Sequence, residues 1–261
     1  MSEEAVFSKD RTELECRDLG YAYSKLKVVF QNINLRTREN EFVAIVGPTG
    51  CGKSTLIRNL AYLTPPTTGH VFLNGSEVKR PSSRISLVHQ SIATFPWMTA
   101  LENVKLSLIS KKLDPAEADR TAREMLQLVG LNGVEDYYPK EMSGGMRQKI
   151  AIARALAASP EILLLDEPFV HLDELTATSM RREIYNLVFN PETSLKSAVL
   201  VSHNLNEVIE LSDRVYVMNG SPATLVDEIN VNIPRPRSPR DPTFFDFVDR
   251  LYNELDMNLK Q

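Results

Sequence analysis

The chain contains few cysteines and no long hydrophobic run. Only two of its 261 residues, Cys16 and Cys51, are cysteines, which is too few for a disulfide framework or a metal knuckle. No apolar stretch approaches the roughly 18 residues of a membrane-spanning helix, and the start Met-Ser-Glu-Glu is acidic where a signal peptide would be basic. We therefore expect a soluble chain in a reducing compartment, whose membrane role, if any, comes through partners.

The chain also lacks an excess of positive charge. It has 30 Lys and Arg against 34 Asp and Glu, a formal net charge of −4. This balance argues against a protein that mainly grips nucleic acid, so no nucleic-acid partner is expected. With 43% hydrophobic and 25% charged residues, the composition is that of an ordinary globular protein with one large α/β domain or two modest ones.

Strand-like and helix-like segments alternate along most of the chain. Several short, nearly continuous apolar runs are typical of strands buried on both faces of a mostly parallel sheet. These runs are 42–46, 84–88, 162–165, 198–201 and 215–218. Residues 12–38 instead alternate between apolar and polar, and 70–75 end in an Asn-Gly turn signal. The sequence therefore predicts an α/β fold with a small antiparallel layer beside a helix-covered, mostly parallel sheet.

Helical patterns replace the strand pattern from about residue 93 to residue 160. One helix is expected to begin at Asp114-Pro115 and to end at Gly130, with its apolar residues on one face. We expect a helical subdomain at about 93–160, inserted in a domain that spans 1–230.

The segment 231–261 is expected to form a linker and a terminal helix. The prolines of 233–242 exclude regular structure there. The helix that follows is expected to be amphipathic. Its apolar face is expected to carry Phe244, Val248, Leu251, Tyr252 and Leu255.

A phosphate-binding motif follows the apolar run 42–46. Residues 47–55 fit the pattern GxxxxGK[ST] between a strand and a helical run, which is the context that the motif requires. Glycines let the backbone approach phosphates, Lys53 can span the β and γ phosphates, and Ser54 can ligate Mg²⁺. The alternative is a glycine-rich turn without a ligand, but a chance match has odds of roughly one in a hundred. The residues expected to bind nucleotide are Gly47, Pro48, Thr49, Gly50, Cys51, Gly52, Lys53, Ser54 and Thr55.

An acidic pair ends the apolar run 162–165. A carboxylate at the end of a buried strand suits Mg²⁺ at Asp166 and a water-activating base at Glu167. The pair alone is a weak signal, because acidic residues commonly end strands at the surface. Together with the phosphate-binding motif it is a strong one.

A third motif, Met142-Ser-Gly-Gly-Met146, precedes a helix-forming run. Ser143, Gly144 and Gly145 would place a second anion site at a helix N-terminus. A serine N-cap with a flexible entry is the alternative. The order of motifs along the chain is completed by Gln90 and His203.

This order of motifs resembles the ABC ATPase family from Tyr23 to about Gly220. The resemblance implies a P-loop NTPase (RecA-like) core, ATP and Mg²⁺ as cofactors, and ATP held between two chains. It assigns Tyr23 to the adenine, Ser143–Gly145 in trans to the partner's ATP, and His203 to the γ-phosphate. The implied catalytic residues are Lys53, Gln90, Glu167 and His203, and the implied Mg²⁺ ligands are Ser54, Gln90 and Asp166.

Each of these roles has an alternative. Tyr23 competes with its neighbour Tyr21, and either is also an ordinary half-buried strand aromatic. Gln90 is otherwise a surface polar residue, and His203 a core histidine. Trp97 and Met98 lie in a segment that resembles the region where such ATPases receive a helix of the membrane subunit. The alternative for both is plain core packing.

The resemblance also implies partners and a location. The expected partners are a second ATP-binding subunit, identical or paralogous, transmembrane permease subunits and, indirectly, a substrate-binding protein. The chain would then be cytoplasmic, on the inner face of the membrane. Met146 with Arg147-Gln148, the segment 96–99 and the Pro/Arg tail resemble the nitrate/sulfonate/taurine-type importer ATPases, which implies import of a small molecule.

Three departures from the family pattern stand out. The signature is MSGGM in place of LSGGQ, residues 170–173 are Val-His-Leu-Asp in place of Ser-Ala-Leu-Asp, and Asn204 replaces a frequent Asp. We still expect activity, because Ser143–Gly145 are kept. The change at 170–171 bears on communication between two sites.

Two other functions are alternatives. A soluble ABC ATPase acting on nucleic acid or ribosomes would carry a long coiled-coil insertion between Gln90 and Ser143, or a second cassette, and neither is found. A P-loop kinase would have no use for Ser143–Gly145 or His203.

Overall fold

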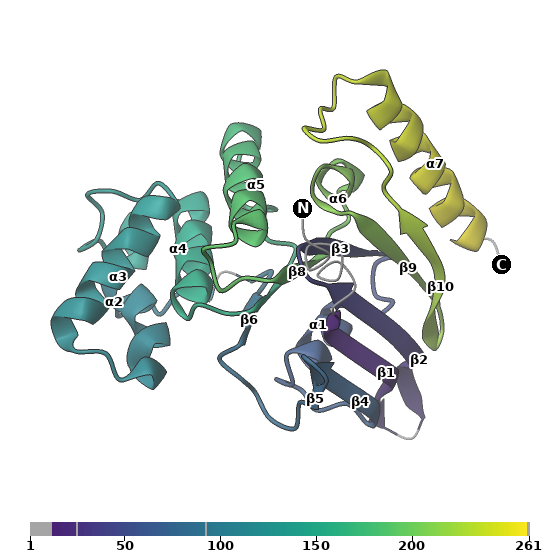
Figure 1. Ribbon diagram of the computed structural model, residues 1–261, viewed down its shortest axis with the longest axis horizontal. Helices are drawn as coiled ribbons and strands as arrows, with labels where there is room; N and C mark the ends of the chain where they lie inside the picture. Colours follow the sequence, from purple (N-terminus) through teal and green to yellow (C-terminus); the bar gives the residue numbers. More distant parts are fainter. Residues whose placement is uncertain (1–11, 25, 92, 260–261) are drawn as a thin grey trace, which may run out of the picture. The chain divides into compact units, whose positions relative to one another are not determined.

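The computed structural model describes residues 12–24, 26–91 and 93–259, which divide into two compact units (Figure 1). The first unit contains the described parts of 1–82 and 196–261, and the second contains those of 83–195. The terminal segment 231–261 is thus part of the first unit. The acidic start of the chain lies outside the described residues.

The sheet of the first unit combines parallel and antiparallel strands. Its strand order is β5-β4-β1-β2-β10-β9-β3-β8. β3 is parallel to both β8 and β9, whereas β1 is antiparallel to β2 and β4. The bounds are β1 Thr12–Ser24, β2 Lys27–Arg38, β3 Glu41–Val46, β4 Thr68–Leu73, β5 Ser76–Glu77, β8 Ser197–Val201, β9 Arg214–Gly220 and β10 Ala223–Asn230. The predicted buried runs 42–46, 198–201 and 215–218 and the antiparallel layer are confirmed.

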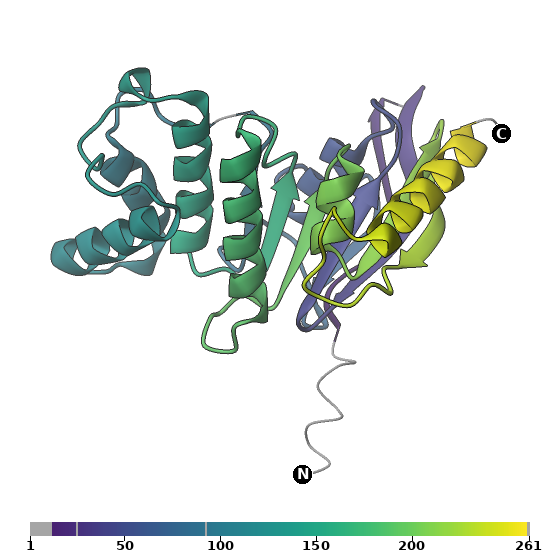
Figure 2. The same ribbon diagram turned by 90° about the horizontal axis from the view of Figure 1, so that it is seen from above.

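Three helices belong to the first unit, and the terminal one packs on its neighbours. They are α1 (Lys53–Leu60), α6 (Leu205–Leu211) and α7 (Pro242–Leu259). α7 runs beside α6 and β9 in both views (Figures 1 and 2). Phe244 and Leu251 are buried as expected, but Tyr252 is 65% exposed. The prediction for Tyr252 was wrong, because it lies about 100° around the helix from Leu251.

The Pro/Arg segment before α7 has no regular structure, as predicted, but its arginines bind the end of α6. Arg235 donates to the carbonyl oxygens of Glu210 and Leu211, both at 2.8 Å. Arg237 donates to the carbonyls of Ile209 at 2.7 Å and Ser212 at 2.5 Å. The segment is therefore anchored by cations that satisfy the open carbonyls of a helix C-terminus.

The second unit combines a strand pair with a group of helices. β6 (Ile85–Val88) and β7 (Ile162–Asp166) are parallel. The helices are α2 (Ala100–Lys105), the 3-10 helix η3 (Leu106–Lys111), α3 (Pro115–Leu128), the 3-10 helix η4 (Pro139–Glu141), α4 (Gly144–Ala157) and α5 (Glu174–Phe189). α2, α3 and α4 pack on one another, and α4 also packs on β6. The helical pattern expected from about 93 to 160 is present, and the same unit also contains β6, β7 and α5.

The limits of α3 follow from its end residues. The Asp114 carboxylate accepts from the backbone N–H groups of Ala116 and Glu117, both at 2.9 Å, and Pro115 occupies the first turn.

Among the residues that the structure describes, no helix is long and apolar enough to cross a membrane.

Candidate functional site

The phosphate-binding motif forms a tight loop between β3 and α1 of the first unit. Gly47 has φ +155°, and a Cβ atom there would lie 2.1 Å from the carbonyl oxygen of Met218 in β9. Gly52 has φ +109°, and a Cβ atom there would lie 2.6 Å from Cγ1 of Val29 in β2. Only glycine fits either position, because the loop packs directly against both strands.

Lys53 lies across this loop. Its Nζ donates to the carbonyl oxygens of Gly47 at 2.8 Å and Pro48 at 2.9 Å, and the side chain is buried. Ser54 and Thr55 follow in the first turn of α1, both half-buried. The structure thus places a cation and the N-terminus of a helix beside one glycine-rich loop, which is an arrangement suited to phosphate.

Cys51 is half-buried within the same loop. Burial raises the pKa of its thiol, and the nearby Lys53 charge opposes this only in part. The thiol is therefore mainly protonated at neutral pH.

Tyr23, unlike Tyr21, has a solvent-exposed ring beside the loop. Tyr23 is 60% exposed, and its hydroxyl lies 3.5 Å from Oγ1 of Thr55. Tyr21 packs instead between Tyr23 and Phe30, with ring centroids 5.1 Å and 6.3 Å away. The exposure of Tyr23 favours it over Tyr21 as a stacking surface for a base.

His203 lies at the same sheet edge as the phosphate-binding loop. β8 pairs with β3 in parallel, with Val201 opposite Ile45, so His203 and Gly47 each lie two residues beyond this pair. His203 is exposed, so it is not a core histidine.

The turn that carries His203 is fixed by a buried hydrogen-bond pair that the sequence analysis missed. The Ser202 hydroxyl donates to Oε2 of Glu207 at 2.7 Å and accepts from the backbone N–H of Asn204 at 3.1 Å. Asn204 in turn caps α6 by accepting from Asn206 N–H at 3.0 Å. An Asn at 204 therefore performs the capping that the more frequent Asp would perform.

Gln90, Asp166 and Glu167 lie at one edge of the second unit's strand pair. β6 and β7 are parallel, with Val88 opposite Leu165, so all three residues stand at the carboxyl ends of these neighbouring strands. Gln90 is exposed, whereas Asp166 and Glu167 are buried. Amide and carboxylate oxygens of this kind suit a hard cation or a water molecule.

The signature residues form the start of α4. The Ser143 hydroxyl caps the helix by accepting from the backbone N–H of Met146 at 3.2 Å. Gly144 and Gly145 fill the first turn, which has no acidic residue. The serine-cap alternative is therefore correct in geometry, but it also leaves the positive end of a helix open to an anion.

The predicted residues thus fall into two groups. The first unit brings together Tyr23, the loop 47–55 and His203. The second unit brings together Gln90, Asp166 and Glu167, and it also carries Ser143–Gly145.

The comparisons with known proteins agree on one family. The family model described as "ABC transporter" matches residues 30–170. An uncharacterized ABC transporter ATP-binding protein of Methanocaldococcus jannaschii is 40% identical over 86% of this chain and 83% of its own. An aliphatic sulfonates import ATP-binding protein of Bacillus cereus and a nitrate import ATP-binding protein of Synechocystis sp. are each 36% identical over 87% of this chain and 88% of their own. A dimeric ATP-binding cassette solved with ADP and Pi after hydrolysis has a TM-score of 0.76 and 29% identity, over 85% of this chain and all of that one.

Proposed function

The chain belongs to the ABC transporter family as an ATP-hydrolysing subunit, and we propose that it powers import of a small molecule through separate permease subunits. The main support is that one chain has two features suited to binding phosphate. These are the loop 47–55 in one unit and the capped N-terminus of α4 in the other. A chain with a single, self-contained ATP site would need only the first. Two copies of the present chain can each provide the N-terminus of α4 to the ATP that the other binds.

At each ATP, Lys53 neutralises charge on the β and γ phosphates, and Tyr23 stacks on the adenine. Glu167 accepts the proton of the attacking water, Gln90 orients that water, and His203 contacts the γ-phosphate. Mg²⁺ would be held by Ser54, Gln90 and Asp166, whose oxygens are the hard donors that this ion prefers. When bound, the ion would neutralise negative charge on the phosphates.

Ser143, Gly144 and Gly145 bind the ATP of the partner subunit. The dimeric relative bound to ADP and Pi supports an arrangement of two chains. The replacement of Gln by Met at position 146 leaves this anion site intact, because it is the backbone N–H of Met146 that binds the Ser143 hydroxyl. We therefore expect the MSGGM signature to be active.

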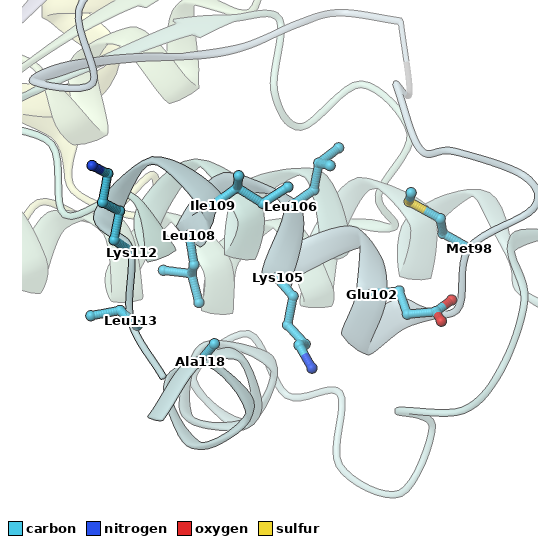
Figure 3. Close-up of a pocket in the computed structure, with 9 residues that line it drawn as sticks. All are labelled: Met98, Glu102, Lys105, Leu106, Leu108, Ile109, Lys112, Leu113 and Ala118. Carbon is cyan, nitrogen blue, oxygen red and sulfur yellow. The ribbon is translucent and has the colours of Figure 1, made fainter. Parts of the chain in front are cut away.

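The permease contact is assigned to the surface around 95–104 of the second unit. Trp97 is 68% exposed and packs edge-on against Phe95, with centroids 5.6 Å apart, so it is not a core residue. The next residue, Met98, lines a pocket of about 320 Å³, with Met98 and Glu102 at one end and Lys112 and Leu113 at the other (Figure 3). An exposed tryptophan and an apolar pocket in one segment suit the side chains of an inserted helix.

The site assignment is tested by Mg²⁺-dependent ATP hydrolysis of the purified chain. We expect Lys53→Ala, Glu167→Gln and Ser143→Arg each to abolish turnover, while Ser179→Arg, on the exposed surface of α5, leaves it unchanged. We also expect the rate to rise faster than linearly with chain concentration. Full activity of Ser143→Arg would contradict the shared site.

The transport assignment is tested by purifying the tagged chain from its own cells. We expect membrane proteins to copurify, and the purified complex in vesicles to take up nitrate, bicarbonate or a sulfonate such as taurine when ATP is supplied. Recovery of ribosomes or DNA without any membrane protein would instead support the soluble ABC ATPase.

A further inference from the structure

One buried side chain of α4 is hydrogen-bonded to the residue that follows Glu167. Gln148 is fully buried, and its Nε2 donates to the carbonyl oxygen of Pro168 at 2.8 Å. The two residues are 20 positions apart in the chain, so the bond exists only because α4 lies beside the segment that follows β7. It attaches the signature helix to the peptide next to the proposed base.

The backbone at Glu167 needs such support. Glu167 has φ +50°, in the left-handed region that residues with a side chain rarely occupy. A backbone of this kind persists only where the surroundings determine it, and it is found most often at functional sites. The Gln148 carboxamide fixes the carbonyl of the very next residue, and thus the direction in which the chain leaves Glu167.

A second contact holds the same segment to α4. Leu172 N–H donates to the carbonyl of Phe169 at 3.0 Å, which closes a turn directly after Pro168. A Cβ atom at Gly145 would lie 3.3 Å from Cδ2 of Leu172 and 3.6 Å from the carbonyl oxygen of His171. The first turn of the signature helix therefore packs against this turn, while Gln148 binds Pro168 ahead of it.

Packing alone does not explain a glutamine at position 148. Its Oε1 is buried and has no hydrogen-bond partner among the described residues. An unsatisfied buried oxygen destabilises the fold, so an apolar side chain of the same length would be better if only volume mattered. The donor group is the part of this side chain that the structure uses.

We propose that Gln148 is a positioning residue for ATP hydrolysis, which holds the Glu167 carboxylate in place from the signature helix. The proposal rests on the proposed function, in which Glu167 is the base and Ser143 binds the partner's ATP. Ser143 lies five residues before Gln148, about 7.5 Å along the same helix. Contact of the signature with one ATP is thereby linked mechanically to the base that acts on the other.

The test is Gln148→Met, which keeps the length of the side chain and removes the donor. We expect kcat to fall about 10- to 100-fold, as when supporting groups of a site are removed, with the KM for ATP changed by less than about twofold. Gln127→Met, at an exposed position of α3, is the matched control and should match the unmodified chain. Ile150→Val, at a buried position of α4, controls for lost packing and should lower Tm without lowering kcat.

A double variant separates positioning from general damage. In the Glu167→Gln background, Gln148→Met should change the residual single-turnover rate by less than about twofold, because the group through which it acts is already gone. The same fold loss in both backgrounds, or an unchanged kcat of Gln148→Met alone, would overturn the proposal. If Glu167→Gln itself retained full turnover, Glu167 would not be the base. That result is distinguishable from both outcomes that would overturn the role of Gln148 alone.

Discussion

The reactivity of the Cys51 thiol reports whether the phosphate-binding loop is covered. Because the thiolate is the reactive form and burial raises the pKa of this thiol, alkylation should be slow at neutral pH. Its rate should still increase with pH above about 8.5, the pKa of an ordinary cysteine, because the pKa of this thiol is raised. We further predict that Mg-ATP slows the reaction several-fold by covering the loop.

Peptide mass spectrometry over time, with and without Mg-ATP, checks this prediction. Cys16 is an internal control, since burial raises its pKa to about 12 and it should stay unlabelled. The Cys51→Ser variant identifies the labelled peptide. Equal rates with and without Mg-ATP would show that nucleotide does not cover Cys51.

A buried ion pair stabilises the start of the strand that leads to the loop. Arg214 is fully buried and donates to both carboxylate oxygens of Glu41 at 2.9 Å and to Glu228 at 2.8 Å. We predict that Arg214→Met lowers the free energy of unfolding by about 3 kcal/mol, because it leaves the buried Glu41 carboxylate without this partner. Adding Glu41→Gln should recover part of the loss.

Urea denaturation measures both variants. Lys196→Met is the matched control, because Lys196 pairs with Glu39 at 3.6 Å at a partly exposed position and should cost less than about 1 kcal/mol. An Arg214→Met variant as stable as this control would mean that the buried pair contributes nothing.

Site residues that lie in one stretch of the chain could be predicted from the sequence. Pairs of residues that are brought together by the fold could not. The spacing of 47–55 alone indicated the loop and Lys53, because motif and geometry lie in one stretch of chain. The Gln148–Pro168 bond joins positions 20 residues apart through the fold. No local pattern pairs these residues, so only the structure reveals them.

At the scale of elements, the end of α6 depends on the Pro/Arg segment. The side chain of Arg237 is only 3% exposed and donates to four backbone carbonyls, those of Val231, Ile233, Ile209 and Ser212. We predict that Arg237→Ala lowers the free energy of unfolding by about 2 kcal/mol or more, because charged donors to buried carbonyls are lost together.

The control is Arg240→Ala, in the same segment but with an exposed side chain. Chemical denaturation should show little change for it. If the two variants lose equal stability, the segment is the plain solvated linker that its composition suggests.

Element boundaries were well predicted where capping residues mark them. Asp114-Pro115 and Gly130 delimit α3 because their preferences are local. The orientation of Tyr252 and the attachment of the Pro/Arg segment were not predicted, because both depend on which surface the terminal helix meets.

At the scale of the molecule, the functional groups divide between two units. The phosphate-binding loop and His203 belong to the first, and the acidic pair and the signature to the second. The order of motifs predicted the family, because that order is a property of the sequence. The division into units was not foreseen, since it depends on how segments from the two ends of the chain pack together.

We propose that each ATP is hydrolysed between the loop of one chain and the signature of another. The most direct test mixes two inactive variants, Lys53→Ala and Ser143→Arg, and measures ATP hydrolysis while native mass spectrometry confirms mixed dimers. Half of the dimers then contain one chain of each kind, with one complete site of two, so about a quarter of the unmodified activity should return. If mixed dimers form and the mixture remains as inactive as either variant alone, the ATP sites are not shared between chains.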